Sequence, residues 1–213
     1  MIIIALNAPA NSGKDEIAKY LNKHYGAVHM EIKELLFDVA IRAAGVSKKL
    51  WYALYEREYK ERPCPYLMVN GAHVSPREWM IHCSEGLMKP IFGDTVFGTA
   101  LRKKLEEIEA NHPDPKNLVV VLSDGGFVAE ALPNMDLVGT HNYYLARVQR
   151  VDENGDASKY GFGADSRRFL YAKDFGFPIR AVDWENRPNE LEQLAEEIYA
   201  DALANKKSSW EKP

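Results

Sequence analysis

The sequence contains few cysteines and no long apolar run, and each absence excludes a class of protein. The two cysteines, Cys64 and Cys83, are too few for a disulfide framework and lack the spacing of a metal site. The apolar opening from Met1 to Leu6 has no basic leader and breaks at Asn7, so it is too short for a membrane span or a secretory signal. We therefore expect a cytoplasmic protein without a membrane partner.

The chain also lacks an excess of basic charge. Its 27 lysine and arginine residues are outnumbered by 31 aspartate and glutamate residues, which gives a formal net charge of −4. Proteins that hold nucleic-acid phosphates usually gather basic side chains into a patch, whereas here basic and acidic residues are interleaved. Nucleic acid is therefore not an expected partner. The length of 213 residues suits one α/β domain with inserted segments.

Short, continuously apolar runs alternate with helical patterns along the chain. Residues 2–6 and 118–122 are apolar throughout, which is typical of parallel strands that helices cover on both faces. The remaining predicted elements are strands over residues 143–148 and 179–182 and helices over residues 14–23, 95–109, 169–175 and 189–204. This alternation predicts a three-layer α/β fold around a parallel sheet.

Two segments exceed what such a fold needs. Residues 31–112 are mostly helical in pattern and form an insertion far longer than a crossover requires. Residues 150–170 are polar and contain glycine, which suits a lid. The insertion could instead be a helical cap that only stabilises the sheet, and the lid a surface loop. We expect a single domain over residues 1–205, with its core in 1–30, 113–150 and 176–205 and a flexible tail in 206–213.

The first predicted strand leads into a loop that ends at Gly13 and Lys14, where a helix begins. A phosphate-binding loop, or P-loop, needs backbone N–H groups curled around a phosphate, a helix N-terminus and a lysine that reaches the phosphate oxygens. Ala8 replaces the first glycine of the pattern, at a cost of about 1 kcal/mol if φ there is positive. Asp15 stands where a serine or threonine hydroxyl usually binds Mg²⁺. A carboxylate can also bind this ion. The alternative is an ordinary strand-to-helix turn.

The sequence predicts ATP and Mg²⁺ as cofactors of this loop, with strict dependence on magnesium. The residues expected at the bound nucleotide are Asn11, Ser12, Gly13, Lys14, Asp15 and Glu16. Lys14 is also expected to be catalytic, because phosphoryl transfer requires positive charge at the β- and γ-phosphates.

Four segments resemble those of bacteriophage deoxynucleoside monophosphate kinases. Residues 12–15, Ser-Gly-Lys-Asp, resemble the Gly-Lys-Asp variant of the loop in that family. Residues 74–79, Val-Ser-Pro-Arg-Glu-Trp, resemble its (T/S)PRE helix start. Residues 123–130 resemble its D-x-R-F-x-x-E element, and residues 183–191 resemble its D…N…G…E-L passage. The four segments occur in the family's order and together span most of the chain.

The resemblance implies a P-loop kinase that transfers phosphate from ATP to a deoxynucleoside monophosphate (dNMP), and similar kinases are often homodimers. It places Arg77 at the phosphate of the acceptor. Two positions depart from the family pattern, because Gly126 and Lys89 stand where the family has arginine. The candidate substrate-binding residues are Arg77, Trp79, Lys89, Asp124 and Glu130.

Asp15 and Asp124 are the candidate magnesium ligands, since Asp124 follows an apolar strand as Walker-B aspartates do. Asp124 could instead cap a helix that begins at Gly125. Arginines that close over the transferring phosphate would neutralise developing charge, and Arg150 and Arg167 are the first candidates, ahead of Arg147 and Arg168. The catalytic candidates are thus Lys14, Asp124, Arg150 and Arg167.

Two other functions compete with the dNMP kinase. One is a P-loop kinase that acts on another small phosphorylated metabolite. The other is a degenerate P-loop protein that binds a nucleotide for regulation, which the replacements at Ala8, Lys89 and Gly126 keep open.

Overall fold

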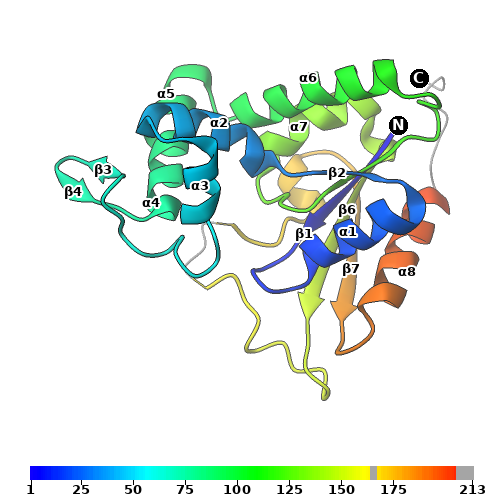
Figure 1. The fold of residues 1–213 in the computed structure, drawn as a ribbon. Coiled ribbons are helices and arrows are strands. Elements are labelled where there is room, and N and C mark those ends of the chain that lie inside the picture. Colours follow the sequence, from blue (N-terminus) through cyan, green and yellow to red (C-terminus); the bar gives the residue numbers. More distant parts are fainter. Residues whose placement is uncertain (164–166, 205–213) are drawn as a thin grey trace. The chain divides into compact units, whose positions relative to one another are not determined.

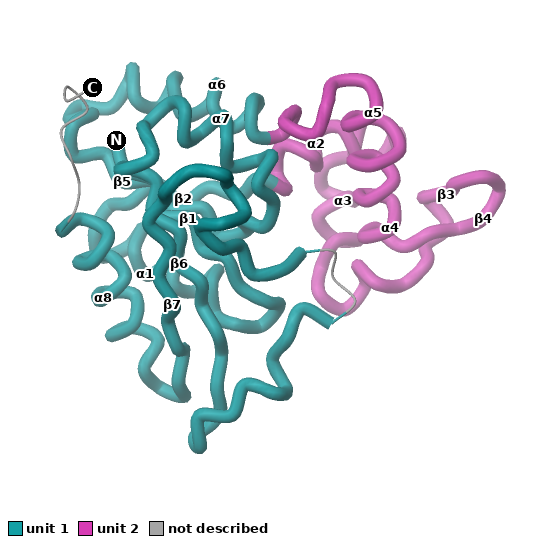
Figure 2. The backbone as a smooth tube through the Cα atoms, turned by 180° about the vertical axis from the view of Figure 1, so that it is seen from behind, with its two compact units in different colours: residues 1–32, 98–213 teal, residues 33–97 magenta. Residues whose placement is uncertain are grey.

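The computed structural model describes residues 1–163 and 167–204 and contains two compact units (Figure 2). Unit 1 comprises residues 1–32 and the described residues from 98 onward, and unit 2 comprises residues 33–97. The sheet lies in unit 1. The segment expected to be a flexible tail falls outside the described residues.

Unit 1 is built on a five-stranded parallel sheet in the order β2-β5-β1-β6-β7 (Figure 1). Its strands are β1 (Ile2–Asn7), β2 (Val28–Met30), β5 (Val119–Leu122), β6 (Tyr143–Arg150) and β7 (Arg180–Asn186). All residues of β1 and β5 are buried, as their continuous hydrophobicity predicts. The central position of β1 brings the loop that follows it to the middle of the carboxyl edge of the sheet.

Helices cover both faces of this sheet, so the predicted three-layer α/β fold is confirmed. The helices of unit 1 are α1 (Lys14–Tyr25), α7 (Val128–Val138), α8 (Leu191–Ala204) and α6 (Val96–Asn111), whose first two residues belong to unit 2. Ile2, Ile4 and Leu6 of β1 share one buried cluster with side chains of α1 and α8. Helices α6 and α7 lie over the other face (Figure 1).

One local prediction is wrong, and one strand was missed. Residues 169–175 are not a helix, because only a 3₁₀ turn forms over Ala172–Phe175. The amides before it are held by side chains instead: Leu170 N donates to Asn7 Oδ1 and Tyr171 N to Asp174 Oδ2, each at 2.8 Å. The short edge strand β2 was not predicted. No helix in the described part of the chain is long and apolar enough to span a membrane.

Unit 2 is mainly helical and encloses its own aromatic core. Its elements are α2 (Ile32–Ala44), whose first residue belongs to unit 1, α3 (Lys48–Leu54), the hairpin of β3 (Met68–Val69) and β4 (Ala72–His73), α4 (Pro76–Ile81), a π-helix over His82–Met88 and α5 (Lys89–Phe92). Phe37 and Trp51 meet edge to face with ring centroids 5.6 Å apart, and Trp79 joins the same cluster.

Candidate donor site at the phosphate loop

The loop between β1 and α1 has backbone conformations that a phosphate-binding loop would need. It runs from Asn7, the last residue of β1, to Lys14, the first residue of α1. Gly13 has φ of 85° and Asn11 has φ of 64°, which are left-handed conformations that glycine and asparagine tolerate best. Ala8 is not in this region, so glycine is not needed there and the predicted strain does not arise.

The side chain of Lys14 curls back over the loop instead of extending into solvent. Its Nζ donates a hydrogen bond to the carbonyl oxygen of Pro9 at 3.1 Å. Glu16, one residue beyond Asp15, is exposed and pairs with Lys19 at 2.7 Å. Lys14 therefore lies against the loop, whereas the side chain of Glu16 is exposed.

Two oxygen atoms at the loop are buried and have no hydrogen-bond partner among the described residues. They are Oγ of Ser12, whose side chain is fully buried, and Oδ1 of Asp15. A buried polar atom without a partner costs about 1–3 kcal/mol, and binding of a ligand or an ion is one way in which that cost is recovered. A carboxylate oxygen is a ligand that Mg²⁺ prefers. The loop therefore fits an anionic ligand with a magnesium ion beside it.

Asn7 connects the start of the loop to two other segments. Its Nδ2 donates to the carbonyl oxygens of Gly125 at 3.0 Å and of Arg168 at 3.1 Å. Its Oδ1 accepts from Leu170 N, so both amide hydrogens and the oxygen of this fully buried side chain are used. The loop after β5 and the chain after residue 167 are thus held at the phosphate loop.

Asp124 lies at the carboxyl end of β5 but does not cap the helix that follows. The N-cap of α7 is Phe127, which makes no side-chain capping hydrogen bond, so the alternative in which Asp124 is the N-cap of a helix beginning at Gly125 is wrong. Asp124 Oδ1 instead accepts from the backbone N–H of Ile32, the first residue of α2, at 2.8 Å. The side chain therefore holds a helix N-terminus 92 residues earlier in the chain.

Ser123, which precedes Asp124, lies in a polar group with His29 and Glu31, for which the sequence predicted no role. Nε2 of His29 lies 2.9 Å from Oγ of Ser123, and that hydroxyl donates to Oε1 of Glu31 at 3.2 Å. His29 belongs to β2, so this group was missed together with the strand. Groups of three or more His, Cys, Asp or Glu side chains that could by themselves hold a metal ion do not occur among the described residues.

The four arginines of the predicted lid region fall into two pairs. Arg147 is buried and forms a bidentate ion pair with Asp183, with both distances at 2.6 Å. This pairing lowers the pKa of the Asp183 carboxyl below its usual range. Arg168 pairs in the same way with Asp174. These two arginines hold segments of unit 1 together.

The other two arginines, Arg150 and Arg167, contact the loops that follow β1 and β5. Arg150 Nη1 donates to the carbonyl oxygen of Asn11 in the phosphate loop at 3.0 Å, and its guanidinium lies 5.1 Å from the ring centroid of Tyr160. The stem of Arg167 lies against Gly126, where a Cβ atom would come within 2.5 Å of Arg167 Cδ. The glycine that replaces the family's arginine thus makes room for Arg167. The predicted lid also includes residues 164–166, which lie outside the described residues.

Three of the candidate substrate-binding residues belong to unit 2. Arg77 Nη1 lies 3.2 Å from Glu61 Oε1, and Lys89 Nζ lies 2.6 Å from Glu85 Oε1. Trp79 is buried and donates from Nε1 to the carbonyl oxygen of Ala40 at 3.0 Å, so its ring is part of the core of unit 2.

Glu130, the remaining candidate, lies in the first turn of α7 in unit 1. Among the described residues it is the one Asp or Glu that is buried, with 8% exposed.

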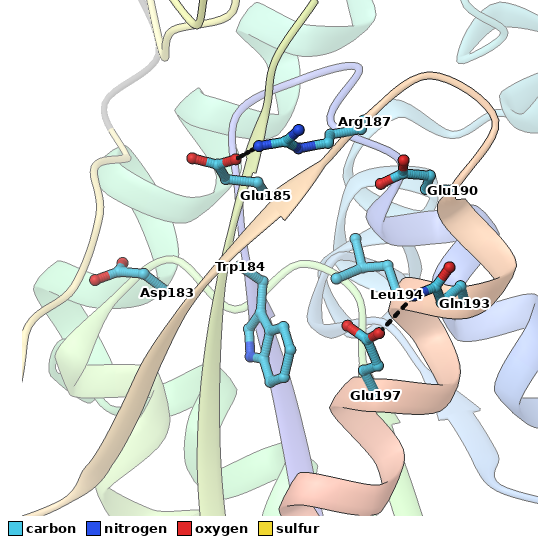
Figure 3. A pocket seen from close by; sticks show the side chains of 8 residues that line it. All are labelled: Asp183, Trp184, Glu185, Arg187, Glu190, Gln193, Leu194 and Glu197. Carbon is cyan, nitrogen blue, oxygen red and sulfur yellow. Dashed lines mark hydrogen bonds and ion pairs between the residues drawn. The ribbon is translucent and has the colours of Figure 1, made fainter. Parts of the chain in front are cut away.

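A cavity of about 240 Å³ lies between β7 and α8 (Figure 3). Its polar lining is mainly acidic, and two interactions between neighbours along the chain pair Arg187 with Glu185 and Gln193 with Glu197. Phosphates would be repelled by such a lining. The cavity is therefore not the anion site that the sequence predicts.

No family model matches the sequence, and no curated protein matches it. Among solved structures, shikimate kinase from Acinetobacter baumannii in complex with shikimate is similar, with 15% identity, coverage of 97% of this chain and 95% of that chain, and a TM-score of 0.43. Shikimate kinase from Aquifex aeolicus has 16% identity and a TM-score of 0.30, and the match covers 100% of this chain and 89% of that chain. An uncharacterized protein from Eubacterium ventriosum has 16% identity, coverage of 99% and 83%, and a TM-score of 0.30. Likeness at this level assigns no activity. The parallel sheet and the loop after its central strand define an α/β protein of the P-loop type.

Proposed function

We propose that the protein transfers the terminal phosphate of ATP to a deoxynucleoside monophosphate, with Mg²⁺ as cofactor. The observation that carries the proposal is the loop from Asn7 to Lys14, which combines left-handed residues, a helix N-terminus and a lysine that donates to the carbonyl of Pro9. These are the features by which main-chain amides and one ammonium group hold a polyphosphate.

The donor's phosphates would be held by the backbone from Asn11 to Lys14 and by the Lys14 ammonium group. Lys14 would leave the Pro9 carbonyl for the β- and γ-phosphate oxygens, because a phosphate is a stronger acceptor than a neutral carbonyl. Its charge would then stabilise the negative charge that the oxygens carry in the transition state.

Asp15 and Asp124 would hold the magnesium ion, directly or through water. Asp15 is the better supported, because its buried Oδ1 has no partner in the described structure. Asp124 already accepts the Ile32 amide with Oδ1. When bound, the ion would neutralise charge on the transferring phosphate.

Arg150 and Arg167 are the cations that we assign to the transferring phosphate. Arg150 already contacts the phosphate loop at Asn11, and Arg167 lies against Gly126, two residues after Asp124. Transfer of Arg150 from the loop carbonyl to a phosphate oxygen would exchange a neutral acceptor for a charged one.

The identity of the acceptor is supported by the family resemblance of residues 74–79, 123–130 and 183–191. We assign Arg77 to the acceptor's phosphate, where its planar fork suits two oxygens. Lys89 and Glu130 remain candidates for the acceptor on the same ground. Trp79 is not assigned a stacking role, because its ring lies in the core of unit 2.

The test is release of ADP from MgATP in the presence of each of the four dNMPs in turn. Matched reactions would contain a ribonucleoside monophosphate, shikimate or no acceptor. Turnover with at least one dNMP, dependent on magnesium, is the expected result. Turnover with a different acceptor alone would transfer the proposal to another metabolite kinase. Tight ATP binding without any turnover would favour a regulatory nucleotide-binding protein.

A further inference from the structure

Asn186, the last residue of β7, contacts the phosphate loop from the neighbouring strand. Its side chain is 7% exposed, and its Nδ2 donates to the carbonyl oxygen of Ser12 at 3.0 Å. Asn186 and Arg150 are register partners on β7 and β6, and Arg150 donates to the carbonyl of Asn11. Two adjacent strands therefore bind two consecutive carbonyls of the loop.

The direction of these carbonyls determines the direction of the loop amides. In a trans peptide the C=O and the following N–H point in opposite directions. A hydrogen bond that fixes the Ser12 carbonyl toward Asn186 consequently turns the N–H of Gly13 away from it. In the same way, until Arg150 transfers to a phosphate, its bond to the Asn11 carbonyl turns the N–H of Ser12 away from Arg150. These N–H groups are among those that a phosphate would bind.

The fit between Asn186 and the loop leaves little freedom. A Cβ atom on Gly13 would lie 2.6 Å from Nδ2 of Asn186 and 3.0 Å from Cδ1 of Leu191. The backbone carbonyl of Asn186 is also fixed, because it accepts from Val151 N at 3.1 Å. Asn186 is therefore held both by its backbone carbonyl and by its side-chain carboxamide.

We propose that Asn186 is a positioning residue of the donor site, which directs the Gly13 amide toward the phosphates of ATP by holding the Ser12 carbonyl. The inference rests on the proposed function of the loop. Asn186 does not itself touch the phosphate in this arrangement, and its effect is expected on the binding of MgATP.

The isosteric change Asn186→Asp tests this role, because a carboxylate has the same shape but cannot donate to the Ser12 carbonyl. Binding of MgATP by calorimetry and the KM and kcat of both substrates would be measured. We expect the Kd and KM for MgATP to rise about tenfold or more, while the KM of the acceptor stays unchanged. Asn186→Ala, which removes the donor without adding charge, is expected to act in the same direction.

Asn142→Asp is the matched control. Asn142 is also buried and donates from Nδ2 to one carbonyl, that of Val138, at 3.1 Å. It precedes β6, at the end of the sheet opposite to the phosphate loop. Both aspartate variants are expected to lose thermal stability, and only the variant at residue 186 should lose affinity for MgATP.

The outcomes separate this inference from the function on which it rests. If the unaltered protein binds MgATP and Asn186→Asp and Asn186→Ala bind it equally well, Asn186 has no positioning role although the donor site stands. An equal loss of affinity in Asn142→Asp would reduce the effect to general destabilisation and overturn the inference. Failure of the unaltered protein to bind MgATP would overturn the donor site and this inference together.

Discussion

Two arginines, one at the phosphate loop and one in unit 2, are held by different kinds of partner. Arg150 donates to a main-chain carbonyl at 3.0 Å and lies over the Tyr160 ring, whereas Arg77 lies 3.2 Å from the carboxylate of Glu61. A carbonyl and a ring do not cancel the charge of a guanidinium, but a carboxylate does. At the proposed donor site Arg150 would therefore meet a phosphate without first leaving this kind of partner, whereas Arg77 would have to exchange one carboxylate for a phosphate.

The largest effect is expected from Lys14→Ala. Removal of the ammonium group should lower kcat/KM roughly 100- to 1,000-fold, because it contributes charge to the transition state. Thermal unfolding should change little, since the Lys14 side chain donates to a loop carbonyl and is not packed in the core. The matched control is Lys23→Ala in the last turn of the same helix. Near-normal turnover of Lys14→Ala would remove the basis for the donor site.

Arg150→Ala is expected to have the next largest effect and tests the first half of the comparison. Loss of a cation that already lies at the loop should reduce kcat roughly 10- to 100-fold. Arg150→Lys should recover only part of this, because an ammonium group cannot form the two-pronged contact of a guanidinium. Arg168→Ala is the control, since Arg168 is paired with Asp174. Equal losses in both variants, measured as kcat at saturating ATP, would show that proximity to the loop is irrelevant.

Arg77→Ala tests the role proposed for the arginine of unit 2 and should change only the kinetics of the acceptor. We expect its KM for the dNMP to rise about tenfold, with the KM for ATP unchanged. Glu61→Gln should act in the opposite direction and lower the acceptor KM by about twofold, because it releases Arg77 from an exposed ion pair. A rise in the acceptor KM of Glu61→Gln would mean that this carboxylate orients Arg77 and does not compete with the phosphate.

The parts of the fold that depend on local pattern could be predicted from the sequence. The runs at residues 2–6 and 118–122 became β1 and β5 because both are buried throughout. The loop could be recognised because strand, Gly13, Lys14 and helix are consecutive. β2 was missed because a three-residue edge strand, Val-His-Met, is only half-buried and has no periodicity to detect.

The hydrogen bonds that hold the phosphate loop in place could not be predicted, because the residues that they join are distant in the chain. Asn186 and Ser12 are 174 residues apart, and Asn7 and Gly125 are 118 residues apart. The same limit applies to the arginines. Arg147 and Arg150 are three residues apart on β6, and only the register with β7 shows that Arg147 faces Asp183 whereas Arg150 contacts the loop.

The smallest expected effect concerns Arg147, a buried arginine of unit 1 that is paired with a carboxylate. Because its hydrogen bonds lower the pKa of Asp183 in the folded state, the pair stabilises the protein above the unfolded pKa of about 3.9 and the stabilisation is lost as pH falls through the lower, folded pKa. Asp183→Asn should therefore reduce the free energy of unfolding at pH 7 by about 1 kcal/mol, a small value because the Asp183 side chain is 76% exposed and water screens the pair. Denaturant unfolding at a series of pH values should show the difference from the unaltered protein shrinking below about pH 4. Glu107→Gln, at an exposed position, should show no such difference. The kcat of Asp183→Asn should stay near normal, because the Arg147–Asp183 pair connects β6 to β7 and is not assigned to the phosphate.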